Sequence, residues 1–144
     1  SYIEATAFGA YTIIQRMEDY GVEINEVVNI GGLSLKNPVL MQIYADVIGK
    51  PMRVSSVDQT CAMGAAILAA VSAGYTDLET LQQRSVKYLD VIYKPIPENQ
   101  AIYKRLYQLY RTLHDSFGVT TNSSGNLAQV MKELMDIRDQ QRKK

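Results

Sequence analysis

The chain has 144 residues, which is enough for one domain with a substantial hydrophobic core. Hydrophobic residues make up 47% of the sequence and charged residues 21%, as in an ordinary soluble globular protein. The 15 basic and 15 acidic residues give a formal net charge of +0, and this balance argues against a module that binds nucleic acid.

The first predicted element is a helix over residues 2–20, whose apolar residues recur at helical spacing: Ile3, Ala7, Ala10, Ile14 and Met17. Gly21 follows as a signal for the end of the helix. The chain begins within this helical pattern and without an initiator Met. We therefore expect a fragment taken from the C-terminal part of a longer protein.

A short buried strand, "EVVNI", is predicted over residues 26–30 and is followed by Gly31 and Gly32. Asn37 and Pro38 then predict the start of a helix, because Asn caps helices and Pro loses no hydrogen bond at the first helical position. This helix is expected to run to residue 48, before Gly49. Its predicted inner face is formed by Val39, Leu40, Ile43 and Val47.

The next predicted pair is a strand over residues 51–55 and a helix of small residues over 60–73. We expect Asp58 or Thr60 to cap this helix, and its Ala and Gly surface to pack closely against the sheet. Cys61 has small apolar neighbours, so we expect a buried structural thiol, no disulfide and a reducing, cytoplasmic setting. The apolar run "CAMGAAILAAVSAG" is too short to span a membrane, and no membrane partner is expected.

The last part of the chain is predicted to contain a short helix with Asp77 near its start, a third strand over 86–95 and a helix over 98–117. A loop over 118–126 and a helix over 127–138 follow. The alternation of helices and strands predicts an α/β layered domain with a partly parallel sheet. Because three strands are few for so many helices, we expect further strands upstream. The predicted inner stripe of the long helix is Ile102, Leu106, Leu109 and Leu113.

The pair Gly31–Gly32 stands after a strand and before a capped helix, which leaves two interpretations open. Ligands of open α/β sheets bind beyond the carboxyl ends of the strands, and glycine allows a ligand to approach the backbone closely. The pair is equally compatible with a plain turn that needs glycine geometry. The sequence has neither a P-loop nor a G-x-G-x-x-G pattern, so the two common nucleotide fingerprints do not decide between them.

Other chemically capable residues favour structural roles. Asp46 lies toward the end of its predicted helix, away from the glycines, and we expect it to be structural or on the surface. His114 is the only histidine, lies off the apolar stripe of its helix and is expected to be solvated. One histidine and one cysteine far apart cannot form a zinc site. The tyrosines of the C-terminal half are expected to pack in the core or at interfaces.

Taken together, the stretches "EATAF", "VVNIGGLSLKNPVLMQIYADVIGKPMRV" and "DQTCAMGAAILAAVSAG" resemble the C-terminal domain of the FGGY family of carbohydrate kinases. The tyrosine and leucine pattern of residues 103–113 is similar to the closing helix of that family. The resemblance covers residues 1–117, and residues 118–144 add a loop and a C-terminal helix. It implies a partial ribonuclease-H-like lobe of the actin-like ATPase superfamily, with short parallel strands and packed helices.

The resemblance also implies an activity and a site. FGGY kinases phosphorylate a sugar hydroxyl, here of a pentulose, with ATP, and Mg²⁺ enters with the nucleotide. Gly31 and Gly32 match the adenosine motif of the family, so they are expected to lie against the adenosine. Leu33, Lys36 and Asn37 are expected near the adenine. The catalytic Asp of the family and most of its sugar contacts belong to the N-terminal lobe, so no catalytic residue is expected in this chain.

Two alternatives remain open beside this resemblance. The chain can belong to another FGGY kinase that acts on a different pentulose or polyol, or it can be a non-catalytic interaction module with the same fold. Without a partner lobe, the chain is expected to expose apolar surface and to form a homodimer through it.

Overall fold

The computed structural model describes residues 2–118 and 127–142. The described helices are α1 (Tyr2–Asp19), α2 (Gly32–Lys36), α3 (Pro38–Ile48), α4 (Thr60–Ser72), α5 (Leu78–Ser85), α6 (Pro97–Gly118) and α7 (Leu127–Arg142). The described strands are β1 (Val27–Asn29), β2 (Met52–Ser55) and β3 (Tyr88–Tyr93). The predicted order of elements is confirmed, except that α2 was not expected. The predicted loop, apart from Gly118 at the end of α6, lies outside the described residues.

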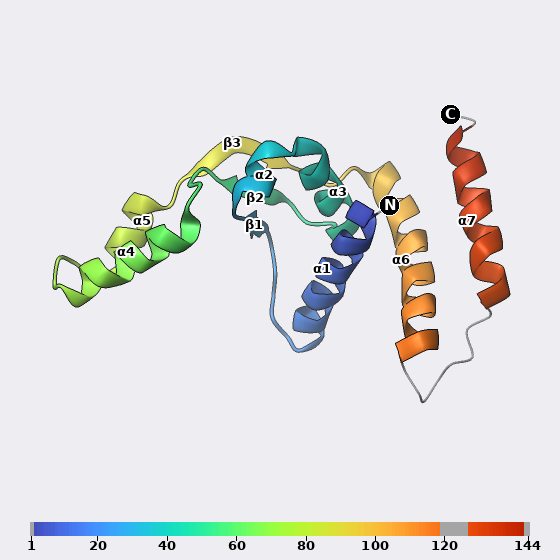
Figure 1. The fold of residues 1–144 in the computed structure, drawn as a ribbon, viewed down its shortest axis with the longest axis horizontal. Helices are drawn as coiled ribbons and strands as arrows, with labels where there is room; N and C mark the ends of the chain where they lie inside the picture. Colours follow the sequence, from blue (N-terminus) through green and yellow to red (C-terminus); the bar gives the residue numbers. More distant parts are fainter. Residues whose placement is uncertain (1, 119–126, 143–144) are drawn as a thin grey trace.

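The three strands form one small mixed sheet in the order β1-β2-β3. β1 and β2 are parallel, with Val27 opposite Met52 and Asn29 opposite Val54, whereas β2 and β3 are antiparallel. The prediction of a partly parallel sheet is thus confirmed. In Figure 1 the sheet lies in the middle of an elongated molecule, between the pair α4 and α5 at one end and the pair α6 and α7 at the other.

Helices α1 and α3 cover one face of the sheet and form the main core with it. The fully buried side chains of this core include Met41 and Ala45 from α3 and Met52 and Val54 from β2. The predicted inner face of α3 is partly wrong, since Val39 is 66% exposed. The stripe that meets the sheet is Met41, Ala45 and Ile48, whereas Ile43 and Val47 pack in a second cluster with Phe8 and Tyr107.

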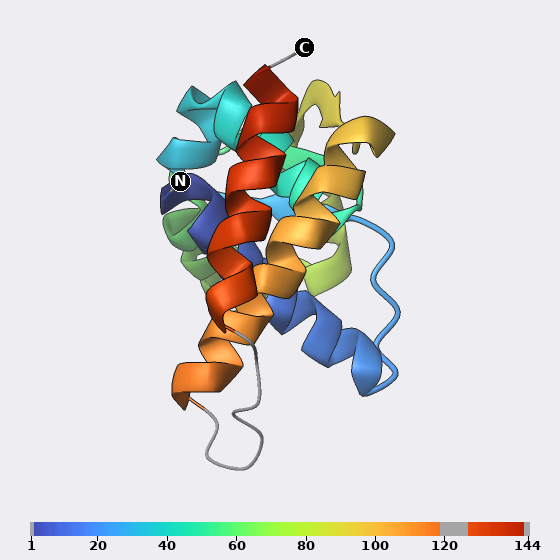
Figure 2. The same cartoon turned by 90° about the vertical axis from the view of Figure 1, so that its right-hand side faces the viewer.

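Helix α6 separates two further hydrophobic clusters. Its tyrosine side packs on α1 and α3, where Tyr107 and Phe8 are buried. Its leucine side packs on α7, where Leu109 meets Val130 and Ile137. Figure 2 shows α7 running alongside α6 on the side away from the sheet. The predicted stripe of residues 102–113 is therefore confirmed as an inner face.

Helix α4 differs most from what its sequence predicts. It packs mainly against α5 instead of the sheet, and Ile67 is its only buried residue in the described part of the chain. Cys61 is exposed, so the expected buried thiol is wrong. The other face of the sheet, with Val28 and Ile92 from β1 and β3, is also left largely exposed. An apolar composition alone does not bury a helix, and no described segment covers the outer side of α4 or this face of the sheet.

Local capping signals agree with the structure at α3 and α5. Asn37 caps α3, with its Oδ1 accepting from the Leu40 amide at 3.0 Å, and Gly49 ends the helix at φ +74. Asp77 caps α5 and accepts from the Thr80 amide at 2.8 Å. This bond is the main cause that lowers the pKa of Asp77 to about 2. Among the described helices, none is both long and apolar enough to cross a membrane.

Candidate functional site

The turn after β1 is built around a backbone conformation that requires glycine. Gly31 has φ +95 and ψ 165, a region that residues with a side chain rarely adopt. The Ser34 hydroxyl, which is buried, donates a hydrogen bond of 2.7 Å to the Gly31 carbonyl. A side chain at Gly31 would meet nothing within 4 Å, so the strain is in the backbone and the space beside it is open.

The predicted site residues follow each other along one short surface segment. Gly32 begins α2, Lys36 ends it, and Asn37 connects it to α3. Lys36 is exposed and Leu33 is 67% exposed, while the side-chain oxygen of Asn37 is already engaged in capping α3. The structure thus keeps all five residues together: Gly31, Gly32, Leu33, Lys36 and Asn37. The backbone amide of Asn37 donates to the Leu33 carbonyl at 3.1 Å, so within the described residues the side-chain Nδ2 is the polar atom of Asn37 that is left for a ligand.

Apolar surface flanks the glycines on the solvent side. Ile30 precedes the glycines and Leu33 follows them, and the two side chains are 58% and 67% exposed. Exposed apolar surface beside a glycine turn suits a flat group such as a nucleobase, which needs close contact more than hydrogen bonds.

Sequence reasoning expected Asp58 or Thr60 to cap α4, and both alternatives are wrong. The N-cap of α4 is Gln59, which makes no side-chain bond to the helix. The Asp58 Oδ1 instead lies 3.7 Å from the point that a Cβ on Gly32 would occupy. The parallel pairing of β1 and β2 was the signal that could have found this neighbour, because it brings the two following turns to the same edge.

Asp46, expected to be structural or on the surface, has a structural role, and His114, expected to be solvated, is exposed. Asp46 is buried and accepts three hydrogen bonds of 2.8 Å, from the Gln42 side chain, the Ile96 amide and the Asn99 side chain. It therefore ties α3 to the start of α6. Within residues 2–118 and 127–142, no group of His, Cys, Asp and Glu side chains is arranged to hold a metal ion.

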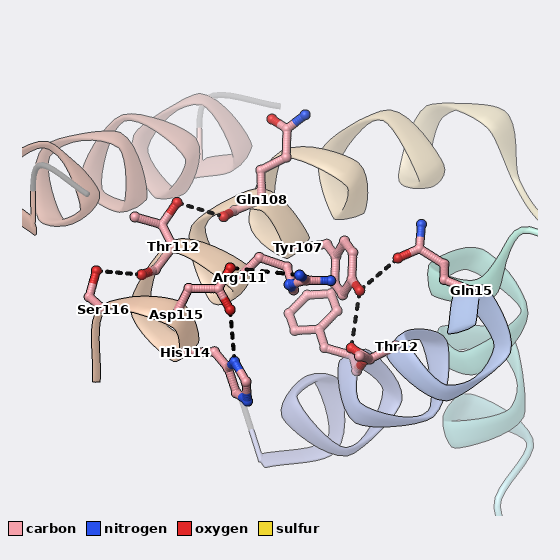
Figure 3. Close-up of polar contacts among 10 residues, drawn as sticks. Thr12, Gln15, Tyr107, Gln108, Arg111, Thr112, His114, Asp115 and Ser116 are labelled. Carbon is pink, nitrogen blue, oxygen red and sulfur yellow. Dashed lines mark hydrogen bonds and ion pairs between the residues drawn. The ribbon is translucent and has the colours of Figure 1, made fainter. Parts of the chain in front are cut away.

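A second polar region lies between α1 and α6 and contains none of the predicted site residues. The Tyr107 hydroxyl contacts Thr12 at 3.0 Å and donates to Gln15 at 2.7 Å, which locks the two helices together (Figure 3). A hydrogen bond with Tyr107 raises the pKa of Arg111, and a bond from His114 lowers the pKa of Asp115. Thr12, Gln15, Arg111, His114 and Asp115, but not Tyr107, are among the residues that line a cavity of about 450 Å³. Each charged group in this network is paired, which is the arrangement of a structural contact.

The fold defines the class of protein to which the chain is similar. A xylulose kinase and a gluconate kinase, both from Lactobacillus acidophilus, each superpose with a TM-score of 0.71 at 24% sequence identity. Each match covers 82% of this chain and 24% of the other. The chain thus has the fold of the matching part of these two kinases.

The sequence comparison is more specific. Residues 1–73 match the FGGY family of carbohydrate kinases, C-terminal domain, and the chain belongs to this family. The ribulokinase of Halalkalibacterium halodurans is 43% identical over 141 residues, and that of Mycolicibacterium smegmatis is 47% identical over 117 residues. The matches cover 94% and 81% of this chain, respectively. The chain spans about 24% and 21% of the lengths of these two relatives.

Proposed function

We propose that the chain is the ATP-binding lobe of a ribulokinase, which converts L-ribulose and ATP to L-ribulose 5-phosphate and ADP. The observation that carries the proposal is its 43% identity, over 94% of its length, to a protein named ribulokinase. The nucleotide-binding part comprises residues 1–117, and residues 118–144 form a C-terminal extension. The protein acts in the cytoplasm, with ATP and a sugar as its ligands.

ATP fits the glycine turn through its adenosine end. Gly31 and Gly32 leave the backbone open to close approach, and Leu33 offers apolar contact to the base. Lys36 and Asn37 present polar groups to the edge of the adenine. Bound ATP supplies the phosphoryl group, and the chain's contribution is to hold and orient the nucleotide so that this group faces the sugar.

Mg²⁺ would accompany the phosphates of ATP. The described residues contain no cluster of carboxylates that could hold the ion by themselves. We propose that Mg²⁺ and the sugar are held mainly by parts of the protein outside this chain, together with the catalytic base. The isolated chain should therefore show no sugar-dependent release of ADP, since phosphoryl transfer depends on positioning both substrates.

The nucleotide site is tested in the complete protein encoded by the gene with a matched pair of glycine substitutions. Gly31 and Gly21 both have positive φ, +95 and +85, and a Cβ at either meets nothing within 4 Å. Both Gly31→Ala and Gly21→Ala strain a turn, but only Gly31 lies in the proposed site. We expect Gly31→Ala to raise KM for ATP about tenfold, with little change in KM for the sugar. An alanine in this backbone conformation costs about 1–3 kcal/mol of strain, which favours a different shape of the turn.

Equal effects of the two substitutions on KM for ATP would contradict the assignment of the turn. A panel of L-ribulose, D-xylulose and glycerol tests the sugar. A clear preference for D-xylulose would favour the alternative suggested by the fold of the xylulose kinases. Absence of phosphorylation with every sugar tested would favour a non-catalytic module of the same fold.

We also propose that the isolated chain forms a homodimer through its exposed apolar surface. The exposed residues include Leu68 on α4 and Val28 and Ile92 on the sheet. Light scattering at increasing protein concentration measures the state directly. A monomer at all concentrations would contradict this proposal.

A further inference from the structure

The turn after β2 lies beside the glycine turn at one edge of the sheet. β1 and β2 run parallel, so the turns that follow them, residues 30–31 and 56–59, leave the sheet at the same edge. The chain in Figure 1 passes from β2 toward α4 beside the start of α2. Ligands of such sheets bind at this edge, where side chains from two turns can reach one molecule.

Asp58 is the acidic side chain of this second turn, and it stands next to the glycines. Its Oδ1 lies 3.7 Å from the position of a Cβ on Gly32. The carboxylate is exposed and makes no hydrogen bond or ion pair with any residue among 2–118 and 127–142. Gln59 and not Asp58 is the N-cap of α4. The side chain therefore has no structural partner in the described part of the chain that would explain its place.

The backbone on which Asp58 stands is held firmly. The buried Ser55 hydroxyl accepts a hydrogen bond of 3.2 Å from the Val57 amide, and the Ser56 amide donates one of 2.9 Å to the Lys87 carbonyl. These two bonds fix the turn to β2 and to the residue before β3. The backbone that carries Asp58 is thus attached to the sheet, and from there its carboxylate reaches the neighbourhood of Gly32.

We infer that Asp58 binds the ribose of the nucleotide by accepting a hydrogen bond from its hydroxyl groups; this rests on the proposed ATP site at Gly31–Gly32. A carboxylate is an acceptor only and repels a phosphate that no cation separates from it, so the uncharged hydroxyl donors of the ribose suit Asp58 better than the phosphates do. The apolar Leu33 and the polar Lys36 and Asn37 are suited to the base. The ribose lies between base and phosphates, and its hydroxyls are donors that an acidic residue at a strand end can bind.

The inference is tested in the complete protein by pairing Asp58 variants with modified nucleotides. Wild type should use ATP at least about tenfold better than 2′,3′-dideoxy-ATP, judged by kcat/KM, since the dideoxy compound leaves a carboxylate without its donor. Asp58→Ala should raise KM for ATP about tenfold and leave KM for the dideoxy compound within twofold. Asp58→Asn retains an oxygen acceptor without charge, so its KM for ATP should lie between those of wild type and Asp58→Ala.

Asp136→Ala, which removes an exposed carboxylate from α7, serves as the control and should change neither KM. The 2′-deoxy and 3′-deoxy forms of ATP then identify which hydroxyl the carboxylate binds. Equal losses with ATP and with the dideoxy compound, or no loss with either, would overturn the inference. Calorimetric binding of each nucleotide gives the same comparison without catalysis.

Failure of the inference and failure of the proposed function give different results. If wild type phosphorylates sugar and Gly31→Ala weakens ATP binding while Asp58→Ala does not, only the role of Asp58 is wrong. If the wild-type protein neither binds ATP nor transfers phosphate to any sugar, both are wrong.

Discussion

The buried carboxylate of Asp46 offers the sharpest test of how this fold is held together. Its Oδ1 accepts hydrogen bonds from the Gln42 side chain and the Ile96 amide, and its Oδ2 accepts one from the Asn99 side chain, each at 2.8 Å. Asp46 is 2% exposed, so water has little access to its two carboxylate oxygens. The perturbation is a pair of substitutions, Asp46→Leu and Asp46→Asn, which have similar size but differ in the acceptors they keep.

The magnitudes follow from counting acceptors. Asp46→Leu removes all three, and because the donors are only partly buried we expect a loss of about 3 kcal/mol. Asp46→Asn keeps one oxygen for Gln42 and Ile96, and its new amide group would face the donor of Asn99. Asn99 can turn its amide by a half rotation and present its own oxygen, which restores the third bond. For Asp46→Asn we therefore expect a loss of about 1 kcal/mol or less.

Hydrogen exchange of the Ile96 amide measures this difference where it arises. A loss of about 3 kcal/mol should speed exchange on the order of 100-fold, and a loss of about 1 kcal/mol about fivefold. The amide of Leu81 in α5, which donates to the Asp77 carbonyl, serves as an internal reference and should not change. Equal acceleration by the two substitutions would refute the acceptor count, because they would then act through packing or charge alone.

Three further substitutions test local features of the fold. Asn37→Ala removes the cap of α3 and should lower the free energy of unfolding by about 1 kcal/mol, whereas Asn37→Asp should not; a denaturant titration decides. Asp77 has a pKa of about 2 against an ordinary 3.8, so its carboxylate stabilises α5 fully above about pH 4, and this stabilisation is lost as the pH falls through 2. The helical circular dichroism of wild type should therefore decrease over this pH range, and that of Asp77→Asn should lack this pH dependence. Tyr107→Phe removes the bonds to Thr12 and Gln15 but keeps the ring, and should cost about 1–2 kcal/mol in the same titration.

Each of these has a result that counts against it. Unchanged stability of Asn37→Ala would mean that Pro38 alone fixes the start of α3. An acid transition of α5 that persists in Asp77→Asn would assign it to another group. A loss in Tyr107→Phe as large as that of Tyr107→Ala would show that the ring, and not the hydroxyl, joins α1 to α6.

The sequence predicted those elements whose signals are local. Asn37, Pro38 and Gly49 mark the ends of α3 within a few residues, because capping and positive φ depend only on neighbours in the chain. Helix α2 was missed because five residues give no readable period and Gly31 has no side chain with which to signal a cap. Its stabilising bond, from Ser34 to the Gly31 carbonyl, is one that many serines in turns could make.

The exposure of Cys61 and the place of Asp58 beside the glycine turn could not be predicted in the same way. Cys61 was expected to be buried from its small apolar neighbours, but burial depends on which distant segment covers α4. Asp58 or Thr60 was expected to cap α4 because both lie just before or at its start, and the position of Asp58 beside Gly32 follows only from the parallel register of β1 and β2. The five residues Gly31, Gly32, Leu33, Lys36 and Asn37 were grouped by family resemblance, and their role in binding stays a prediction.

The position of α6 between two clusters has a consequence for how substitutions combine. Tyr107 on one side of α6 packs against residues of α1 and α3, and Leu109 on the other side packs against residues of α7. Energetic effects of changes on opposite sides of the helix should therefore nearly add, since Leu106 is the one residue among those described that packs against both clusters. Leu106 packs against both clusters, so it is the position through which a change on one side becomes sensitive to a change on the other.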